Sequence, residues 1–433
     1  MIYKNLIVAL TTLLISSQLF AYVGNSSSEA LLQFSAYVEA SSTNNIDELI
    51  EKHVAHLFGP MSLAKYKAAP KGDYTISNIK TIALPSGGVR IDYDYSGLIV
   101  LERGPRTHYE ILLPINLETV YEAGFVGAKN LCTDEHYQDQ GDFWYFWSPS
   151  REGCPLIEEK DFQKVDASVE ILDNSKSTRP EYEMLADKNG VIHISVLMGM
   201  DEPNLSWDPN ISKDINATNF KKIKKSLTET FKFRSLKQWS RQQVSRISLL
   251  DSRTPYVEEF EKVYHRATGQ NYKVVVRVFY GATGIDEKSK PFHYFLRDAI
   301  QNSALMIYDG HSGLGGNLHL LDIEKLRRFE FSPPKNRYQI YFFNSCSSYT
   351  YFNAMFFGRK KTSRDPKGTK YLDILTSGLE TPFDGSATAI MGLINSVHQW
   401  SYRSTMTGFQ ELARRLSMEN LFGVNGDEDN PTF

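Results

Sequence analysis

Cysteine is scarce in this chain, and other features that would narrow its function are missing. The 433 residues include three cysteines and carry a formal net charge of −3. This near-neutral balance, without a long run of one sign, argues against a nucleic-acid-binding protein. After the N-terminal segment, no stretch approaches the roughly 18 consecutive apolar residues of a membrane helix. A globular protein remains, long enough for two domains of ~100–200 residues each.

The N-terminus holds the one marked apolar run. Lys4 precedes the stretch Leu6 to Phe20, which closes on Ala21 and is followed by polar residues. This layout is typical of a signal peptide over residues 1–21, and an uncleaved membrane anchor is the alternative. We therefore expect an exported protein, periplasmic or extracellular, without a stable membrane span after cleavage.

The three cysteines divide into a pair and a remainder. Cys132 and Cys154 are natural disulfide partners in an oxidising compartment, and closing a loop of about 22 residues contributes ~3 kcal/mol in the chain-entropy model. Cys346 is left over. An unpaired thiol in an exported protein is a liability unless it is buried or used. Cys346 is therefore either a reactive group or a small buried hydrophobe.

Residues 22–160 are predicted to form a small α+β domain. Amphipathic patterns predict helices at Ser28–Val38 and Ile46–Phe58. β-Branched and aromatic residues separated by Pro and Gly turns predict an antiparallel meander at Thr75–Leu84, Val89–Arg103 and His108–Ile115. The loop between the paired cysteines carries the aromatic run Asp142–Trp147. This run either forms a ligand platform or packs under the loop or against the next domain.

Residues 165–420 are predicted to form a mostly parallel, doubly wound α/β domain. Short apolar runs alternate with helical patterns, as in sheets that are buried on both faces. The predicted strands are Val191–Met198, Lys273–Phe279, Ala304–Tyr308, Tyr338–Phe343 and Tyr371–Leu375. The predicted helices are Asn216–Phe231, Pro255–Arg266, Pro291–Gln301 and Ser386–Leu416. Residues 421–433 are expected to form a frayed acidic tail.

Two of these strands end abruptly in a reactive side chain. His311 follows the strand Ala304–Tyr308, and Cys346 follows the strand Tyr338–Phe343. In an open parallel sheet, the loops that leave the carboxyl ends of adjacent strands share one crevice, so the two side chains are expected to meet there. Further candidates for the cleft wall, for which plain turns are the alternative, are Asp201, Gly281, Thr283, Asp309 and Ser347.

A strand that ends in Gly310-His311 and a later strand that ends in Cys346 resemble the caspase, legumain and gingipain clan of cysteine peptidases, over roughly residues 185–400. The resemblance implies a caspase-like sheet and a polypeptide substrate. No cofactor is expected, and a zinc site has little support because His311 and His319 are not four residues apart and lack a nearby Cys or carboxylate cluster. The resemblance implies His311 as acid and base, Cys346 as nucleophile, and the backbone amides of Ser312 and Cys346 as oxyanion donors. The chain departs from the clan at Ser312, where glycine is usual.

Clan members also carry processing sites in the loop that corresponds to the basic segment 358–368. The alternative is a plain solvated loop, which is common for runs of charge. The residues of this candidate processing loop are Arg359, Lys360, Lys361, Arg364 and Lys367.

Two other functions are compatible with the same residues. The segment 310–316 resembles the nucleophile elbow of lipases, with Ser312 as the nucleophile of a serine esterase and Asp384 and His398 as downstream partners. Leu314 stands where that elbow requires a small residue, which counts against it. An exported binding protein that kept the fold without catalysis is the other alternative. The expectation we carry forward is an exported cysteine endopeptidase with a His311 and Cys346 dyad.

Overall fold

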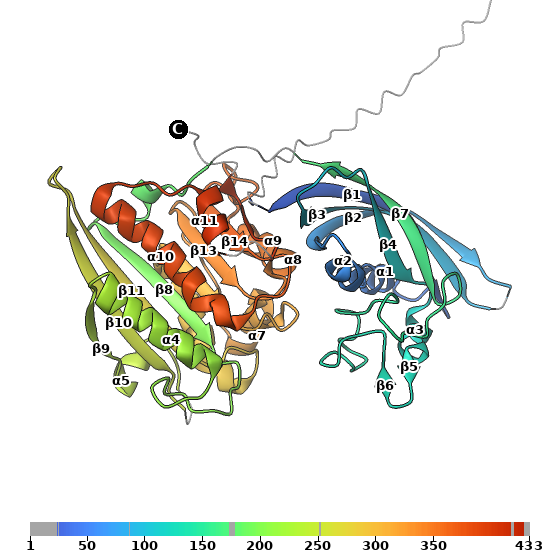
Figure 1. Cartoon of the computed structure of the whole chain (residues 1–433), viewed down its shortest axis with the longest axis horizontal. Coiled ribbons are helices and arrows are strands. Elements are labelled where there is room, and N and C mark those ends of the chain that lie inside the picture. Colours follow the sequence, from blue (N-terminus) through green and yellow to red (C-terminus); the bar gives the residue numbers. More distant parts are fainter. Residues whose placement is uncertain are drawn as a thin grey trace, which may run out of the picture.

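The computed structural model describes residue 24 and residues 26–85, 87–172, 178–250, 253–416 and 420–427. The chain folds as mixed α/β with three sheets, and its two large sheets form two units that lie side by side (Figure 1). The predicted signal peptide, residues 1–21, lies outside the described residues. Within the described ranges, no helix is both long enough and apolar enough to cross a membrane.

The N-terminal unit is a curved five-stranded antiparallel sheet in the order β2-β3-β1-β7-β4. Its strands are β1 (Ser27–Ala40), β2 (Ala68–Ala83), β3 (Val89–Glu102), β4 (His108–Pro114) and β7 (Phe162–Ile171). Helices α1 (Ile46–Ala55) and α2 (Phe58–Leu63) pack on one face of this sheet and close its core (Figure 1). The chain then passes through α3 (Leu117–Ala123) and the small ribbon β5 (Phe125–Val126) and β6 (Lys129–Asn130).

One element and one boundary of this unit differ from the prediction. Ser28–Val38 belongs to strand β1 and is not a helix, because Leu32, Phe34 and Ala36 are buried alternately when the strand pairs with β3 along its full length. That long-range pairing overrides the helical spacing of the same apolar residues. Strand β7 lies beyond the predicted boundary at residue 160, yet it pairs with β1 and β4 and so belongs to the first sheet.

The C-terminal unit is an eight-stranded, mostly parallel sheet in the order β15-β14-β13-β12-β8-β11-β10-β9. Its parallel centre consists of β8 (Val191–Gly199), β11 (Asn271–Gly281), β12 (Leu305–Asp309), β13 (Gln339–Asn344) and β14 (Leu372–Thr376). The antiparallel edges are β9 (Arg234–Gln238), β10 (Tyr256–His265) and β15 (Gly423–Asn425). The prediction of an α/β sheet with mostly parallel strands is confirmed.

Two of the antiparallel strands, β10 and β15, correct the prediction. The segment Pro255–Arg266, expected to be a helix, contains β10, whose aromatic and β-branched residues pair with β11 through a hairpin. Residues 421–427 do not form a frayed tail, because β15 pairs with β14 and both Phe422 and Asp427 are buried. Residues 428–433 of the expected tail lie outside the described part of the chain.

Helices cover both faces of the eight-stranded sheet. On one face lie α4 (Ile215–Lys225) with the π-turn η2 (Ser226–Thr230), α10 (Ser386–Arg403) and α11 (Phe409–Leu416) (Figure 1). On the other face lie α5 (Arg241–Val244), α6 (Lys290–Asn302), α7 (Leu320–Arg327) and α9 (Asn353–Lys360). Alternate residues of strand β12 pack into the two cores. Ile307 packs under the first helix layer, and Met306 packs under the second. Burial on both faces explains the uninterrupted apolar runs of the sequence.

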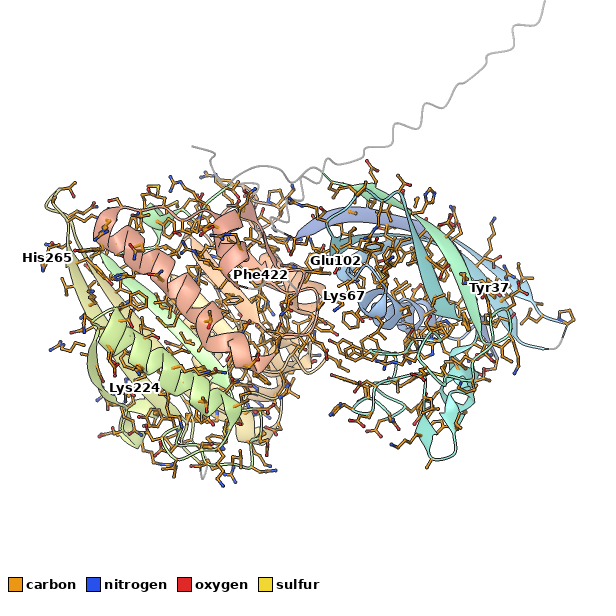
Figure 2. The ribbon with its side chains drawn as sticks, viewed as in Figure 1. Tyr37, Lys67, Glu102, Lys224, His265 and Phe422 are labelled. Atoms are coloured by element: carbon orange, nitrogen blue, oxygen red, sulfur yellow. A yellow bond between two sulfur atoms is a disulfide. The ribbon has the colours of Figure 1, made fainter. Side chains whose placement is uncertain are left out.

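The two units meet along β1, β2 and the short helix α8 (Ser348–Tyr351). Lys67 and Glu102 lie on the N-terminal side of this junction, and Phe422 lies on the other side (Figure 2). The Ser27 hydroxyl donates to the Phe422 carbonyl at 3.3 Å. The Thr350 hydroxyl donates to the carbonyl of Pro70 at 2.6 Å. Helix α8 begins two residues after Cys346, so this junction adjoins the candidate site.

Candidate functional site

His311 and Cys346 leave the same edge of the sheet. Strands β12 and β13 are parallel neighbours, and Asp309 is paired with Asn344 at their carboxyl ends. Each reactive residue lies two positions beyond its member of that pair. Neighbouring strands are about 4.8 Å apart, so the chain delivers both residues to one small region. The topology therefore places the two loops as the sequence predicted.

The imidazole of His311 is oriented by a carboxylate. Its Nε2 lies 3.0 Å from Asp201 Oδ1, and Asp201 follows β8, which flanks β12 on the side opposite β13. A proton on Nε2 that points to Asp201 leaves Nδ1 as the basic nitrogen of the neutral ring. The carbonyl of His311 accepts hydrogen bonds from the Tyr308 hydroxyl at 2.6 Å and from Asn317 Nδ2 at 2.8 Å. These contacts fix the loop, while about half of the His311 side chain stays exposed.

Cys346 is a free, partly buried thiol. Burial raises its pKa, the Thr381 N–H that donates to Sγ at 3.5 Å lowers it, and the negative charge of Glu380 raises it again. The net effect is a raised pKa, so the protonated thiol dominates at neutral pH. A nucleophilic role for this sulfur therefore requires a base that takes its proton.

The loop after β14 contacts both reactive residues, and sequence reasoning did not include it. Thr381 donates its N–H to the Cys346 sulfur, and the Phe383 ring meets the His311 ring edge-on at 5.1 Å between centroids. The rule that singled out the other loops, a break directly after a buried apolar strand, applies equally to this one. It would have marked residues 377–383 from the sequence.

Four of the five further residues proposed for the cleft wall are buried. Gly281, Thr283, Asp309 and Ser347 are buried, and only Asp201 is substantially exposed. Strand ends in a sheet covered on both faces bury the residues nearest the core, which explains the burial of these positions. Their contacts explain what they do. The Thr283 and Tyr308 hydroxyls are 3.2 Å apart, and since Tyr308 donates to the His311 carbonyl, Thr283 donates to Tyr308 and so braces the His311 loop.

Asp309 ties the ends of the two strands together. Its Oδ1 accepts a hydrogen bond from Asn344 Nδ2 at 2.6 Å, and the same Nδ2 donates to the Ser386 hydroxyl at 3.0 Å. Burial raises the pKa of Asp309 to about 6, against the lowering effect of its hydrogen bonds with Ser386 and Asn344. His311 and Cys346 lie two residues beyond the members of this hydrogen-bonded pair.

The disulfide between Cys132 and Cys154 is present, as predicted from the cysteine count. The aromatic run inside its loop divides between two cores. Phe143 and Trp147 pack beside Cys132 within the N-terminal unit. Tyr145 and Phe146 join an aromatic cluster with residues of the C-terminal unit. The run therefore packs both under its loop and against the neighbouring unit, which was one of the two alternatives.

Part of the basic segment is folded into helix α9 and part of it is exposed. Arg359 and Lys360 lie in helix α9, where Arg359 pairs with Glu324 and Lys360 is fully buried. The Lys360 ammonium donates to two backbone carbonyls, those of residues 334 and 337, at 2.8 Å each. Helix propensity and these carbonyl contacts explain why the two residues belong to helix α9 and not to the loop that follows it. Lys361 and Arg364 are exposed, and Lys367 is half-buried.

The residues of the esterase alternative are scattered. Ser312 is buried, and no helix follows it directly as an elbow requires. Helix α10 begins at Ser386, beside Asn344 at the strand ends, and runs away from them. His398 lies 12 residues further on, about 18 Å along the helix axis, and its Nδ1 is 2.7 Å from the Tyr264 hydroxyl. Asp384 is exposed in the turn η5 (Phe383–Gly385).

Comparisons with known proteins add no relative to this picture. Among the described residues, no group of three or more His, Cys, Asp or Glu side chains is arranged to hold a metal ion. No family model matches the chain, and no curated protein matches it.

Proposed function

We propose that this protein is an exported cysteine endopeptidase whose C-terminal unit has a caspase-like fold. One observation carries the proposal. His311 and Cys346 occupy equivalent positions beyond two in-register parallel strands, and the imidazole is paired with Asp201 on its far side. This order of carboxylate, imidazole and thiol along three neighbouring strand ends, β8, β12 and β13, is the arrangement that nucleophilic acyl transfer requires.

The proposed reaction uses His311 Nδ1 as the base. Nδ1 takes the thiol proton as the Cys346 sulfur bonds to the scissile carbonyl carbon, and it returns that proton to the leaving amine when the C–N bond breaks. Water then attacks the thioester, again losing a proton to His311, and the acid product leaves as the sulfur regains its proton. Asp201 stabilises the imidazolium that forms in both halves. The raised pKa of the thiol is compatible with this sequence, because proton transfer accompanies attack.

Backbone amides are the proposed oxyanion donors. The N–H groups of Ser312 and Cys346 follow the two strand ends, and in the described residues neither donates to a backbone carbonyl. Amides held by folded loops stabilise a developing oxyanion without reorganisation. The departure from the clan at Ser312 does not remove this donor, because the donor belongs to the backbone.

Export is supported by the cysteine chemistry. Disulfides form and persist in oxidising compartments, and the Cys132–Cys154 bond closes a segment that contains no long helix or strand. A periplasmic or extracellular location also agrees with the signal-like N-terminal sequence. We propose a polypeptide as the substrate.

The test is cleavage of a peptide library by the purified protein at mild reductant concentration. Cys346→Ala and His311→Ala should each abolish turnover. The matched control is His319→Ala, because His319 lies in the same region, is similarly exposed and pairs with Asp322 instead of a site residue. Asp201→Asn should lower kcat by about 10²–10⁴ without changing the fold, as expected when the orienting carboxylate is lost.

Other outcomes of these assays would support the esterase or the binding-protein alternative. Ester hydrolysis that Ser312→Ala abolishes and Cys346→Ala spares would establish the esterase function. No hydrolysis of any library member, before or after nicking near Arg364, would reject the peptidase. An exported binding protein would then be the better description, and the wild-type and Cys346→Ala proteins should behave identically in the cell.

A further inference from the structure

We propose that Tyr145, in the disulfide-closed segment 132–154 of the N-terminal unit, is a positioning residue for the Cys346 loop. The proposal rests on the proposed function of Cys346. Its central contact is the hydrogen bond between the Tyr145 and Ser347 hydroxyls, which are 2.5 Å apart. The two residues are 202 positions apart in sequence and belong to different units. Ser347 is the residue directly after the nucleophile, so this bond acts on the nucleophile's own backbone.

Ser347 is in a conformation that needs support. Its φ of 50° and ψ of 29° lie in the left-handed region, which is unfavourable for a residue other than glycine. It is fully buried, its N–H donates to the Leu379 carbonyl at 3.0 Å, and its hydroxyl meets Tyr145. These two contacts hold the backbone of the residue that directly follows Cys346 in this conformation.

Tyr145 is itself held rigidly. Its side chain is 1% exposed, and its ring stacks on Phe58 with centroids 4.5 Å apart and planes 4° apart. Two residues later Trp147 is fully buried beside the disulfide, and its backbone lies against Gly59, where an added Cβ would meet the Trp147 carbonyl oxygen at 2.0 Å. A segment without a long helix or strand is fixed by these anchors, so the hydroxyl is presented at a defined point.

The same aromatic cluster also reaches the His311 loop. Leu314 and Tyr351 pack against Tyr145 and its neighbours. An added Cβ on Gly315 would lie 3.0 Å from the Tyr351 ring, which shows how closely the two loops are packed. Segment 132–154 is therefore placed to set the geometry of both reactive loops from outside the C-terminal unit.

Loss of the Tyr145 hydroxyl should loosen the Cys346 loop in two measurable ways. The thiol should become easier to alkylate, because the loop opens more often. Peptide turnover should become slower, because a misplaced nucleophile loses rate without losing substrate affinity. A residue with a merely structural role would not move these two rates in opposite directions.

The experiment compares Tyr145→Phe with Tyr121→Phe in the intact protein. Tyr121 donates its hydroxyl to the Gln138 carbonyl at 2.8 Å inside the same N-terminal region, so its variant loses a tyrosine hydroxyl contact that does not involve Ser347. Iodoacetamide labelling of Cys346 is followed by mass mapping across pH 6 to 9, with kcat and KM for a cleaved peptide. Tyr145→Phe should be labelled about fivefold faster, the factor that one hydrogen bond provides, with kcat about tenfold lower and KM unchanged. Tyr121→Phe should match the wild type.

Ser347→Ala removes the other partner of the bond and gives a second route if Tyr145→Phe folds poorly. Its labelling rate should rise as much, and the double variant should add nothing further. Labelling of Tyr145→Phe and Ser347→Ala within twofold of the wild type would overturn the proposal, and so would an equal rise in Tyr121→Phe. If the wild type cleaves no peptide, the peptidase function fails, but the labelling comparison still decides whether Tyr145 positions Cys346.

Discussion

Asp309→Asn should change how the stability of the protein depends on pH. Burial raises the pKa of Asp309 to about 6 in the folded protein, whereas an aspartate in an unfolded chain titrates near ~3.9. Between these values the folded state binds more protons than the unfolded state. The contribution of this group is therefore present at about pH 4 and is lost as the pH rises through the folded-state pKa.

The size of the effect follows from the burial of the carboxyl. Asp309 is fully buried, and its Oδ2 has no hydrogen-bond partner among the described residues. A difference of about two pK units corresponds to ~3 kcal/mol of unfolding free energy, at ~1.4 kcal/mol per unit. Asparagine keeps an acceptor for Asn344 Nδ2 and does not titrate. As the pH rises from about 4 to 7, the free energy of unfolding of the variant should therefore increase by ~3 kcal/mol relative to that of the wild type.

Urea unfolding at several pH values measures this difference directly. Asp187→Asn is the control of opposite sign. Burial raises the pKa of Asp187, but the N–H groups of Val191 and Asn189 donate to its carboxylate and hold the pKa below its usual range. The Asp187 carboxylate stabilises the fold above its unfolded pKa, so that variant should lose stability relative to the wild type as the pH rises. A wild-type minus Asp309→Asn difference that stays constant within ~0.5 kcal/mol across this range, a margin set by linear extrapolation, would refute the reasoning.

Three further predictions concern stability. Lys71→Met leaves the buried carboxylate of Glu29 without its ammonium, whose Nζ lies 3.5 Å away, and should cost ~3–5 kcal/mol of unfolding free energy, much of which Glu29→Gln in the same chain should restore. Replacing Cys132 and Cys154 by Ser should cost ~3 kcal/mol under non-reducing conditions, and an unchanged melting temperature would contradict this. Arg328→Gly should stabilise by up to ~1 kcal/mol in thermal unfolding, because this exposed residue ends α7 with a φ of 57° that glycine adopts freely.

The sequence alone determined the strands that lead to the two residues of the candidate site. The strands before His311 and Cys346 are uninterrupted apolar runs, and such runs are recognisable because both faces of a central parallel strand are buried. The disulfide followed from counting, since an odd cysteine number with two near neighbours leaves one natural pair. These signals are local, so they survive without knowledge of the fold.

Tertiary structure decided the rest, because the deciding interactions join distant residues. Strand β10 became a strand through its pairing with β11, although its residues also fit a helical spacing. Asp201 reaches His311 only because β8 lies next to β12 in the sheet, and strand order is not written in any single segment. The contact between Tyr145 and Ser347 depends on how two units dock. A residue's own pattern indicates what it can form, and the partners that select among those possibilities come from elsewhere in the chain.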